Sequence, residues 1–310
     1  ADLAGLARGI MSERQWQAFE ERTALDIALT SRGGSRFRIN VFEERAGIAL
    51  AIRRLEEEFR ALEDWNLPGS LQELSRLRDG LVLVTGPTGS GKSTTLATVL
   101  HGINRERNCH ILTIEDPIEY LHANDRALVH QRELHTSVRS FAEGVRSAMR
   151  EDPDVLLIGE MRDLETMRAA ITAAETGHLV FSTLHTGDAV GAVDRMIGVF
   201  PASEQESLRQ QLSLVLRAVV AQRLLRAKEG RGMVPAVEVL KVTGAVSNLI
   251  RTGRTEQIYS AMETGAEQGM RTIEQDLADL VKKGRISIDS ARLAARYPAN
   301  LEAWLSRRGG

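Results

Sequence analysis

Hydrophobic and polar positions alternate on two scales along the central part of the chain, from Leu71 to about Leu240. Short apolar runs are separated by longer stretches with helical periodicity. This alternation is typical of an α/β fold in which a mainly parallel sheet carries helices on both faces. We predict strands at 81–85, 110–115, 128–131, 154–159, 179–184 and 234–240, and helices at 92–105, 140–151, 164–176, 188–199 and 203–227.

A different pattern precedes this core. Residues 12–29 have the spacing of a helix, whereas Arg36–Phe42 alternates between polar and apolar side chains, as a half-buried strand does. Gly47–Arg53 is the expected neighbouring strand. We therefore predict a small α+β domain over residues 1–66 and a linker at 67–70, where proline and glycine interrupt the pattern. Because the first residue already lies in a helical pattern, we expect this domain to be partial.

The last part of the chain has helical periodicity throughout. We assign 71–244 to the α/β core and 245–310 to a helical C-terminal region, with helices near 245–262, 271–283, 287–296 and 301–307. This region has no cluster of acids, histidines or glycines suited to phosphate. We therefore expect it to contact partners rather than to carry chemistry.

The composition is that of an ordinary globular protein and narrows the functional classes. The net charge is −2, so no global field draws the chain to nucleic acid. Cys109 is the single cysteine, which excludes a disulfide within the chain and a multi-cysteine zinc site. No apolar run approaches the length needed to cross a bilayer. We expect a cytoplasmic protein without a nucleic-acid partner.

The first candidate site follows the strand at 81–85 and begins the next helix. It is the run Gly86, Pro87, Thr88, Gly89, Ser90, Gly91, Lys92, Ser93, with Thr94 next, and it matches the P-loop pattern at every fixed position. Its glycines let backbone N–H groups surround a phosphate at a helix N-terminus. Lys92 is expected to reach the β- and γ-phosphates of ATP, and the Ser93 hydroxyl to hold Mg²⁺. A glycine-rich turn that binds nothing would leave the adjacent lysine and serine unexplained.

An apolar strand that ends in an acid supplies a candidate catalytic group. The strand at 154–159 is followed by Glu160. In P-loop folds an acid at this point lies beside Mg²⁺ and the γ-phosphate, where it can contact the metal through water and polarise the attacking water. The alternative is a solvated acid at the end of a buried strand.

A second acidic cluster ends the strand at 110–115. Glu115, Asp116 and Glu119 fall at a carboxyl end, where open α/β sheets bind ligands. Glu119 is a candidate for orienting water or hydrated Mg²⁺, and the other two acids are candidates for pairing with basic groups. A solvated loop explains the same residue types.

Two histidines flank the strand at 179–184. We interpret His178 and His185 as sensors beside the γ-phosphate that change partner when the phosphate leaves. They are alternatively ordinary core or surface groups, or zinc ligands, although no cysteine lies near them.

Two arginines lie on the predicted strands of the N-terminal domain. Arg38 and Arg53 are either ordinary surface residues or groups that reach a nucleotide held against the core. In the second case they would neutralise charge that develops during phosphoryl transfer.

The order of these motifs resembles the type II/IV secretion superfamily of ATPases, and most closely the PilT-like retraction ATPases of type IV pili. The likeness covers nearly the whole chain from about Arg36. It depends on a Walker A motif at 86–93, an aspartate box at 113–120, a Walker B signature at 150–163 and a histidine box at 177–186. The Walker B signature is highly specific, far more so than the Walker A motif.

The resemblance implies a RecA-like core, a PAS-like N-terminal domain and a ring-shaped homohexamer. It also implies that ATP lies between the N-terminal domain of one subunit and the core of the next. Glu160 would then be the catalytic glutamate, Glu119 an auxiliary acid, and Arg38 and Arg53 the charge-neutralising arginines. The implied function is a motor that hydrolyses ATP to retract type IV pili. Its implied partners are an inner-membrane pilus platform protein and related pilus ATPases.

Other functions remain open at this point. Pilus extension and type II secretion ATPases are similar, but they usually carry a four-cysteine zinc element, which a single cysteine excludes. An accessory retraction paralogue fits the stretch Ala245–Thr252, which lacks an arginine and an acid typical of the retraction family. A non-catalytic assembly subunit and a RecA-like nucleic-acid motor are further hypotheses, the second opposed by the charge and by the lack of a basic, aromatic-interleaved stretch.

Overall fold

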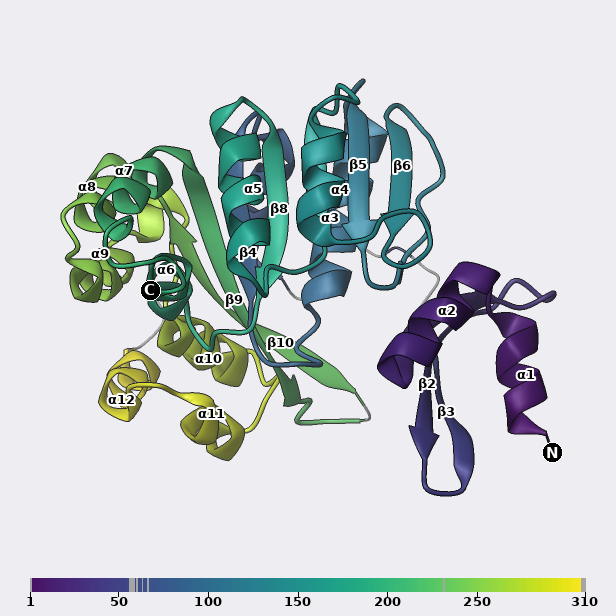
Figure 1. Ribbon diagram of the computed structural model, residues 1–310. Coiled ribbons are helices and arrows are strands. Elements are labelled where there is room, and N and C mark those ends of the chain that lie inside the picture. Colours follow the sequence, from purple (N-terminus) through teal and green to yellow (C-terminus); the bar gives the residue numbers. More distant parts are fainter. Residues whose placement is uncertain are drawn as a thin grey trace.

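The protein contains two separate sheets (Figure 1). The computed structural model describes residues 2–55, 59, 61–62, 64–65, 67–230 and 232–307. The larger sheet has the order β10-β9-β4-β8-β7-β5-β6, and its neighbouring strands are parallel except for β9 and β10. The predicted α/β core with a mainly parallel sheet is confirmed. Its strands are β4 (Gly80–Thr85), β5 (His110–Glu115), β6 (Leu128–Glu133), β7 (Val155–Ile158), β8 (Leu179–Leu184), β9 (Leu216–Arg226) and β10 (Met233–Lys241).

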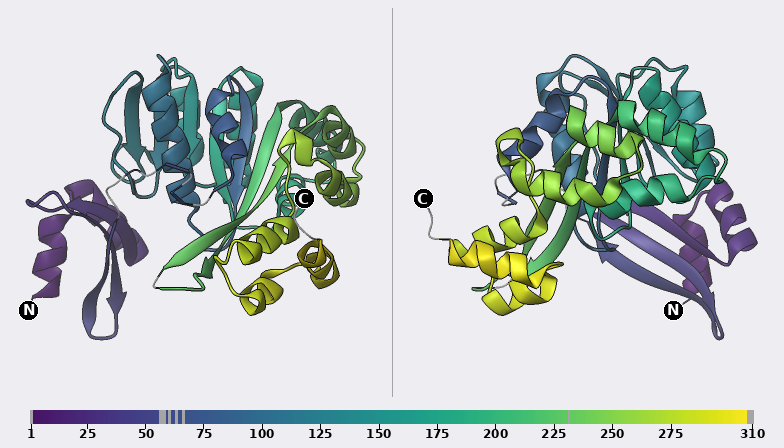
Figure 2. Two further views of the ribbon diagram at one scale, coloured as in Figure 1. Left: turned by 180° about the vertical axis from the view of Figure 1, so that it is seen from behind. Right: turned by 90° about the vertical axis from the view of Figure 1, so that its left-hand side faces the viewer.

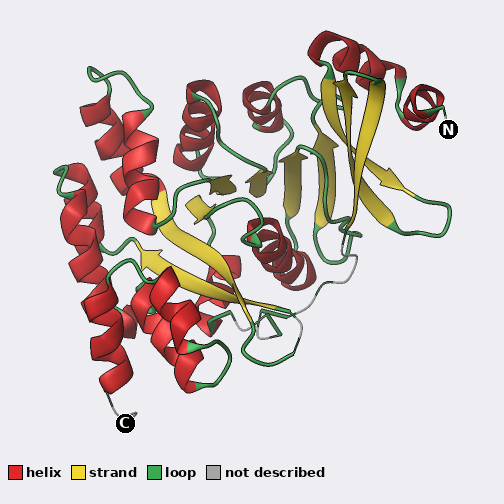
Figure 3. Cartoon of the chain, turned by 90° about the horizontal axis from the view of Figure 1, so that it is seen from below, coloured by secondary structure: helices red, strands yellow, loops and turns green. Residues whose placement is uncertain are grey.

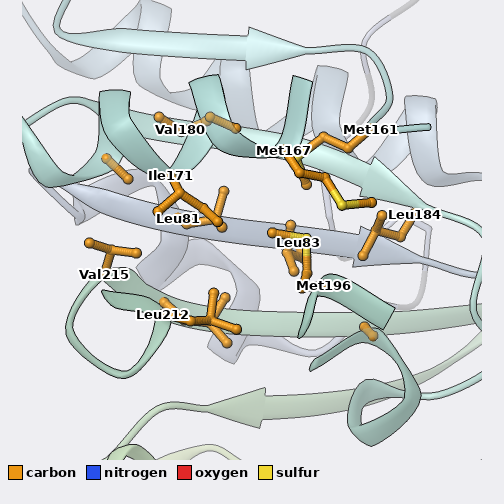
Figure 4. Packing of buried hydrophobic residues seen from close by; sticks show 14 of the residues in the cluster. Leu81, Leu83, Met161, Met167, Ile171, Val180, Leu184, Met196, Leu212 and Val215 are labelled. Carbon is orange, nitrogen blue, oxygen red and sulfur yellow. The ribbon is translucent and has the colours of Figure 1, made fainter. Parts of the chain in front are cut away.

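Helices cover both faces of this sheet because successive strand residues point in opposite directions. Leu81 and Leu83 of β4 join one hydrophobic cluster, and Val82 and Val84 join another. Figure 4 shows the first cluster, in which side chains of α5 and α6 surround the two leucines. The second cluster packs against α3 and the 3-10 helix η1 (Gly69–Arg76). The helices of the core are α3 (Lys92–Glu106), α4 (Phe141–Ala148), α5 (Leu164–Glu175), α6 (Ala189–Gly198) and α7 (Gln205–Val215).

One predicted helix is wrong in its second half. The prediction placed a helix over 203–227, whereas α7 ends at Val215 and β9 begins at Leu216. Strand β9 lies inside the sheet, parallel to β4 and antiparallel to β10, so both of its edges are hydrogen-bonded. Its β-branched Val219 and Val220 are buried on opposite faces. Pairing with two strands that are distant in sequence therefore overrides the local helical pattern.

The N-terminal domain has the predicted α+β character. Its antiparallel sheet β1-β2-β3 packs with two helices around a small core of its own. The predicted helix at 12–29 is correct only as far as Arg22, because Thr23 adopts a left-handed conformation (φ 59°) and the next residues form β1. The elements are α1 (Leu3–Ile10), α2 (Glu13–Arg22), β1 (Ala24–Thr30), β2 (Arg36–Glu44) and β3 (Gly47–Arg54).

The predicted domain boundary at residue 66 lies outside the described residues, and the division into domains stays a prediction. Of the predicted linker at 67–70, Gly69 and Ser70 belong to η1. Leu62 and Leu67, on either side of the predicted boundary, pack in the second core cluster. The end of the predicted N-terminal domain therefore contributes side chains to the core beneath the large sheet.

The C-terminal region is helical, as predicted. The expected helix at 245–262 is interrupted near Gly253, which has a left-handed φ of 71°. Val234 and Ala236 of β10 pack into the core of the last three helices. Strands β9 and β10 extend towards these helices (Figures 1 and 3). The helical elements are α8 (Gly244–Arg251), η2 (Thr255–Gln257), α9 (Ile258–Thr264), η3 (Ala266–Gln268), α10 (Ile273–Lys282), α11 (Ile288–Ala294) and α12 (Pro298–Ser306).

The N-terminal domain and the last helices lie at opposite ends of the core (Figures 1 and 2). The N-terminal domain contacts the loops after β5 and β6 through several arginines. Arg14 donates to the carbonyl of Thr136, and Arg36 donates to the carbonyl of Ile118. None of the helices in the described part of the chain is long and apolar enough to cross a membrane.

Candidate active site

A cavity of about 330 Å³ opens at the carboxyl edge of the large sheet. It lies where β4, β5, β7 and β8 end, so residues that are distant in sequence meet there. It brings together nearly all of the predicted site residues. The lining residues are Arg38, Arg53, Thr88, Gly89, Ser90, Gly91, Lys92, Ser93, Thr94, Glu115, Asp116, Pro117, Glu119, Phe141, Gly159, Glu160, Arg162, Thr183, His185 and Leu224.

The P-loop connects β4 to α3 as predicted, and its first glycine is required by a close approach to β9. A Cβ on Gly86 would lie 2.2 Å from the carbonyl oxygen of Gln222, and its φ of 144° also favours glycine. Gln222 holds the loop from the other side: its Nε2 donates to the Ser90 carbonyl (2.8 Å), and its Oε1 accepts from the Thr95 hydroxyl (2.7 Å). The sequence analysis missed Gln222 because it placed this residue in a helix.

Lys92 is folded back onto the loop that precedes it. Its Nζ donates to the carbonyls of Gly86 (2.9 Å) and Pro87 (3.1 Å). Burial lowers the pKa of this ammonium group, while Glu160 and Glu119 across the cavity oppose the shift. The lysine side chain is only 8% exposed. Its charge thus lies inside the cavity, opposite two carboxylates, at the point where phosphate oxygens would enter.

Glu160 lies two residues beyond the end of β7 and is held by two basic neighbours. His185 Nε2 is 3.2 Å from one carboxylate oxygen, and Arg162 donates to the other at 2.7 Å. His185 reaches this point because β8 is parallel to β7 and ends beside it. The Glu160 side chain is only 14% exposed, so its oxygens are largely shielded from bulk water. Arg162 belongs to the Walker B signature, but the sequence analysis assigned it no role.

His178 lies away from this site. It precedes β8, whereas the cavity is at the other end of that strand. Its Nδ1 is 2.9 Å from the carbonyl oxygen of Ala173 and 3.1 Å from the Thr176 hydroxyl. A strand separates its two flanking residues by its full length, so only His185 lies at the cavity and His178 does not, as a shared sensor site would require. The sensor role of His185 stays a prediction.

The two arginines of the N-terminal domain reach the cavity together. Arg38 and Arg53 are directly opposite each other in the antiparallel pair β2–β3, so both point to the same side. Arg38 donates to Glu119 (3.0 Å) and to Asp26 (3.2 Å). Both arginines belong to the chain that supplies the P-loop, whereas the family resemblance led us to expect them from a neighbouring subunit.

The acids after β5 have different environments. Glu119 lines the cavity and pairs with Arg38. Glu115 accepts hydrogen bonds from the Thr113 hydroxyl and the Gln131 amide, and its charge also acts on Arg36, so its pairing with a basic group stays a prediction. Burial raises the pKa of Glu115 to about 7 and also raises the pKa of Asp116. Buried acids of this kind favour the neutral form, which suits a structural role better than metal binding.

The oxygen donors at the cavity fit Mg²⁺ bound together with a nucleotide. Ser93 supplies a hydroxyl, and Glu160 and Glu119 supply carboxylates at the same cavity. Among the described residues no group of three or more histidines, cysteines and acids is placed to hold a metal. Mg²⁺ bound by one hydroxyl, phosphate oxygens and water needs no such group.

A larger cavity, of about 470 Å³, lies beside later turns of α3. Phe59, His101 and Arg105 are among its lining residues, but neither the P-loop nor Glu160 contributes to it. The cavity at the carboxyl edge is therefore the candidate site.

Comparisons with known proteins identify the family of this chain. Residues 20–292 match the family model described as type II/IV secretion system protein. The chain is 47% identical to the "Type IV pilus retractation ATPase PilT" of Pseudomonas aeruginosa, over 94% of this chain and 84% of that protein. It is 45% identical to a "Twitching motility protein" of Neisseria gonorrhoeae, over 95% and 79% of the two chains.

Solved structures give the same result. The crystal structure of the pilus retraction motor PilT with bound ADP superposes with a TM-score of 0.88 at 44% identity, covering 97% of this chain and 86% of that one. The ATPase DotB of Legionella pneumophila superposes with a TM-score of 0.83 at 28% identity, covering 94% and 82%. The fold is thus that of a group of known ATPases, and the chain belongs to the type II/IV secretion system protein family.

Proposed function

We propose that this protein is a Mg²⁺-dependent ATP hydrolase that drives the retraction of type IV pili as a ring-shaped homohexamer. The observation that carries the proposal is the convergence of the P-loop, the Glu160–His185 pair and two arginines on one cavity. Relatives named for pilus retraction and twitching motility, which align over more than nine tenths of this chain, support the biological role.

The chemistry follows from the positions of the side chains. ATP would displace Lys92 from the carbonyls of Gly86 and Pro87, so that its ammonium group pairs with the β- and γ-phosphates. Ser93 would hold Mg²⁺, which neutralises phosphate charge when bound. Glu160 would orient the attacking water, while His185 and Arg162 hold its carboxylate in place.

Arg38 and Arg53 would act on the charge that develops on the transferred phosphoryl group. Arg38 is already aligned by Glu119 and Asp26 from two sides. Glu119 is thus an auxiliary acid in this proposal, because it positions an arginine beside the phosphates.

Retraction is favoured over extension and type II secretion by how the chains align. The relatives named type II secretion system protein E match only 67% of this chain and about 41% of their own length. A relative named type IV pilus ATPase PilU is 39% identical over 91% of the chain, so an accessory retraction role is the second candidate. For either role we place the protein at the cytoplasmic face of the inner membrane, bound to the pilus platform protein.

Two measurements test the proposal. The purified protein should form hexamers by native mass measurement and hydrolyse ATP in the presence of Mg²⁺ at a rate that single-stranded DNA does not change. Deleting its coding sequence in the host should abolish twitching while surface pili persist. Loss of surface pili would indicate extension instead, and stimulation by DNA would indicate a nucleic-acid motor.

A further inference from the structure

A five-residue segment after β8, residues 185–189, touches the catalytic residues on one side. We call it the connecting segment. It begins with His185, whose Nε2 is 3.2 Å from Glu160. The next residue, Thr186, shares a 2.7 Å hydrogen bond with the hydroxyl of Thr85, the last residue of β4 before the P-loop. The segment is thus joined both to the catalytic acid and to the start of the phosphate-binding loop.

The other side of the connecting segment is held by the C-terminal part of the chain. Asp188 pairs with Arg296, which lies between α11 and α12, at 2.8 Å. Arg223 donates to the Gly187 carbonyl (3.2 Å) and also to the carbonyl of Ala294 at the end of α11. The backbone N–H of Ala189 donates to Glu238 of β10 at 2.7 Å. Consecutive residues therefore link the catalytic acid to the last helices.

Arg296 is itself fixed in place. Its backbone N–H donates to Glu274 (2.9 Å), a fully buried carboxylate that also accepts from the Tyr297 N–H and the Tyr259 hydroxyl. Asp188 is equally constrained, because its carboxylate caps α6 through the Gly191 N–H at 2.7 Å. An ion pair between two anchored groups passes a displacement from one element to the other instead of absorbing it in a flexible side chain.

We propose that Arg296 is a positioning residue for ATP hydrolysis: through Asp188 it sets where His185 meets Glu160, and it thereby couples the helices α10–α12 to the catalytic site. This inference depends on the proposed ATPase function and goes beyond it, because it makes hydrolysis responsive to whatever moves these helices. Thermodynamic linkage then requires the reverse effect. If a partner bound to α10–α12 favours one arrangement of the connecting segment, its affinity must also change with the nucleotide state of the site. The expectation that this region carries no part of the chemistry is modified accordingly.

Arg296→Ala should lower kcat by about three- to tenfold, which lies within the range that such couplings usually span and does not exceed the loss expected for removing His185, and should leave KM for ATP unchanged. Arg292→Ala is the matched control. Arg292 lies one turn earlier and pairs with Glu302 at 2.7 Å on the exposed surface of the same helices, without reaching the connecting segment. Its kcat and KM should stay within twofold of the wild type. Asp188→Asn keeps a side chain that can cap α6 and removes the charge, so it should reproduce the Arg296→Ala effect.

Non-additivity separates positioning from simple damage to the fold. In a His185→Ala background Arg296→Ala should cause no further loss, since its effect passes through that histidine. Thermal unfolding and native mass of each variant verify folding and assembly, and Asp188→Asn carries the test if Arg296→Ala does not fold. Equal kcat for Arg296→Ala and Arg292→Ala, or the same loss with and without His185, would overturn the inference. Glu160→Gln, measured in parallel, tests the proposed function separately: if it hydrolyses ATP like the wild type, the function assignment fails and the inference fails with it.

Discussion

The amino and carboxyl edges of the large sheet carry similar residue types, but only the carboxyl edge forms the cavity beside the P-loop. Strand β7 is preceded by Asp154 and followed, after Gly159, by Glu160, while β8 is preceded by His178 and followed by His185. At the carboxyl edge the acid and the histidine face each other across 3.2 Å in a cavity beside the P-loop. At the amino edge the Asp154 carboxylate accepts the His110 N–H, and His178 hydrogen-bonds its own preceding helix.

The comparison teaches that strand direction, not residue type, decides which pair lies beside the P-loop. Parallel strands bring all of their carboxyl ends to one edge, and the helix that follows β4 directs its N-terminus to that edge. The N-terminal domain then adds Arg38 and Arg53 to the same edge.

The largest loss is expected at the arginines. Arg38→Ala/Arg53→Ala should lower kcat about 10⁴-fold, because charge developing on the transferred phosphoryl group is then unneutralised. Arg45→Ala, in the exposed turn of the same hairpin, is the control and should be neutral. Single-turnover hydrolysis measures the step directly.

Mixed rings test whether the arginines serve their own chain. Both arginines line the cavity of the chain that supplies the P-loop. Mixed hexamers of Arg38→Ala/Arg53→Ala subunits and Lys92→Ala subunits should therefore have no activity, because every subunit lacks one part of its own site. If the arginines acted across subunits, about a quarter of the sites in an equal mixture would be competent and would trap nucleotide.

Glu160→Gln should lower kcat about 10³-fold and leave binding of ATP and Mg²⁺ intact, because the amide has the shape of the acid without its basic oxygen. Asp154→Asn, at the other end of the same strand, should stay within twofold since the amide oxygen can still accept from His110. Equal losses in the two variants would mean that the edges do not differ as described. Steady-state hydrolysis and equilibrium binding of a fluorescent ATP analogue measure the two effects.

His185→Ala should lower kcat about tenfold, as expected for losing one hydrogen bond to a charged group. His178→Ala should change kcat less than twofold, because its ring hydrogen-bonds residues 173 and 176 and does not line the cavity. Steady-state hydrolysis by the two variants measures both values of kcat. A larger loss for His178→Ala than for His185→Ala would contradict the placement of His185 at the site.

The smallest effect on hydrolysis is expected from Glu238→Gln, because Glu238 is a buried acid of β10 that is not among the residues lining the cavity. Burial raises its pKa to about 7. The folded protein then holds a proton that the unfolded chain releases above about pH 4.5, so this group makes the free energy of unfolding fall as the pH rises towards 7, by up to roughly 3 kcal/mol. Glu238→Gln, which keeps the acceptor for Ala189, should lack this decrease. Urea unfolding at pH 5 and pH 8 measures it, and an unchanged pH dependence in the variant would contradict the burial argument.

Much of the site could be predicted from local sequence because its parts are contiguous. The P-loop requires three glycines, a lysine and a serine in one turn, and Glu160 follows an apolar strand directly. These constraints act between neighbours in the chain, so the α/β core, its phosphate-binding loop and the acid were all identifiable before any contact was known.

Tertiary structure decided what depends on distant segments. The chain from Leu216 to Arg226 is a strand because β4 and β10 satisfy both of its edges, and only then does Gln222 reach the P-loop. Likewise His185 rather than His178 meets Glu160, and Arg296 reaches Asp188 across more than a hundred residues. Each of these results depends on strand order, direction or packing, which are properties of pairs of elements and leave no signal at a single position of the sequence.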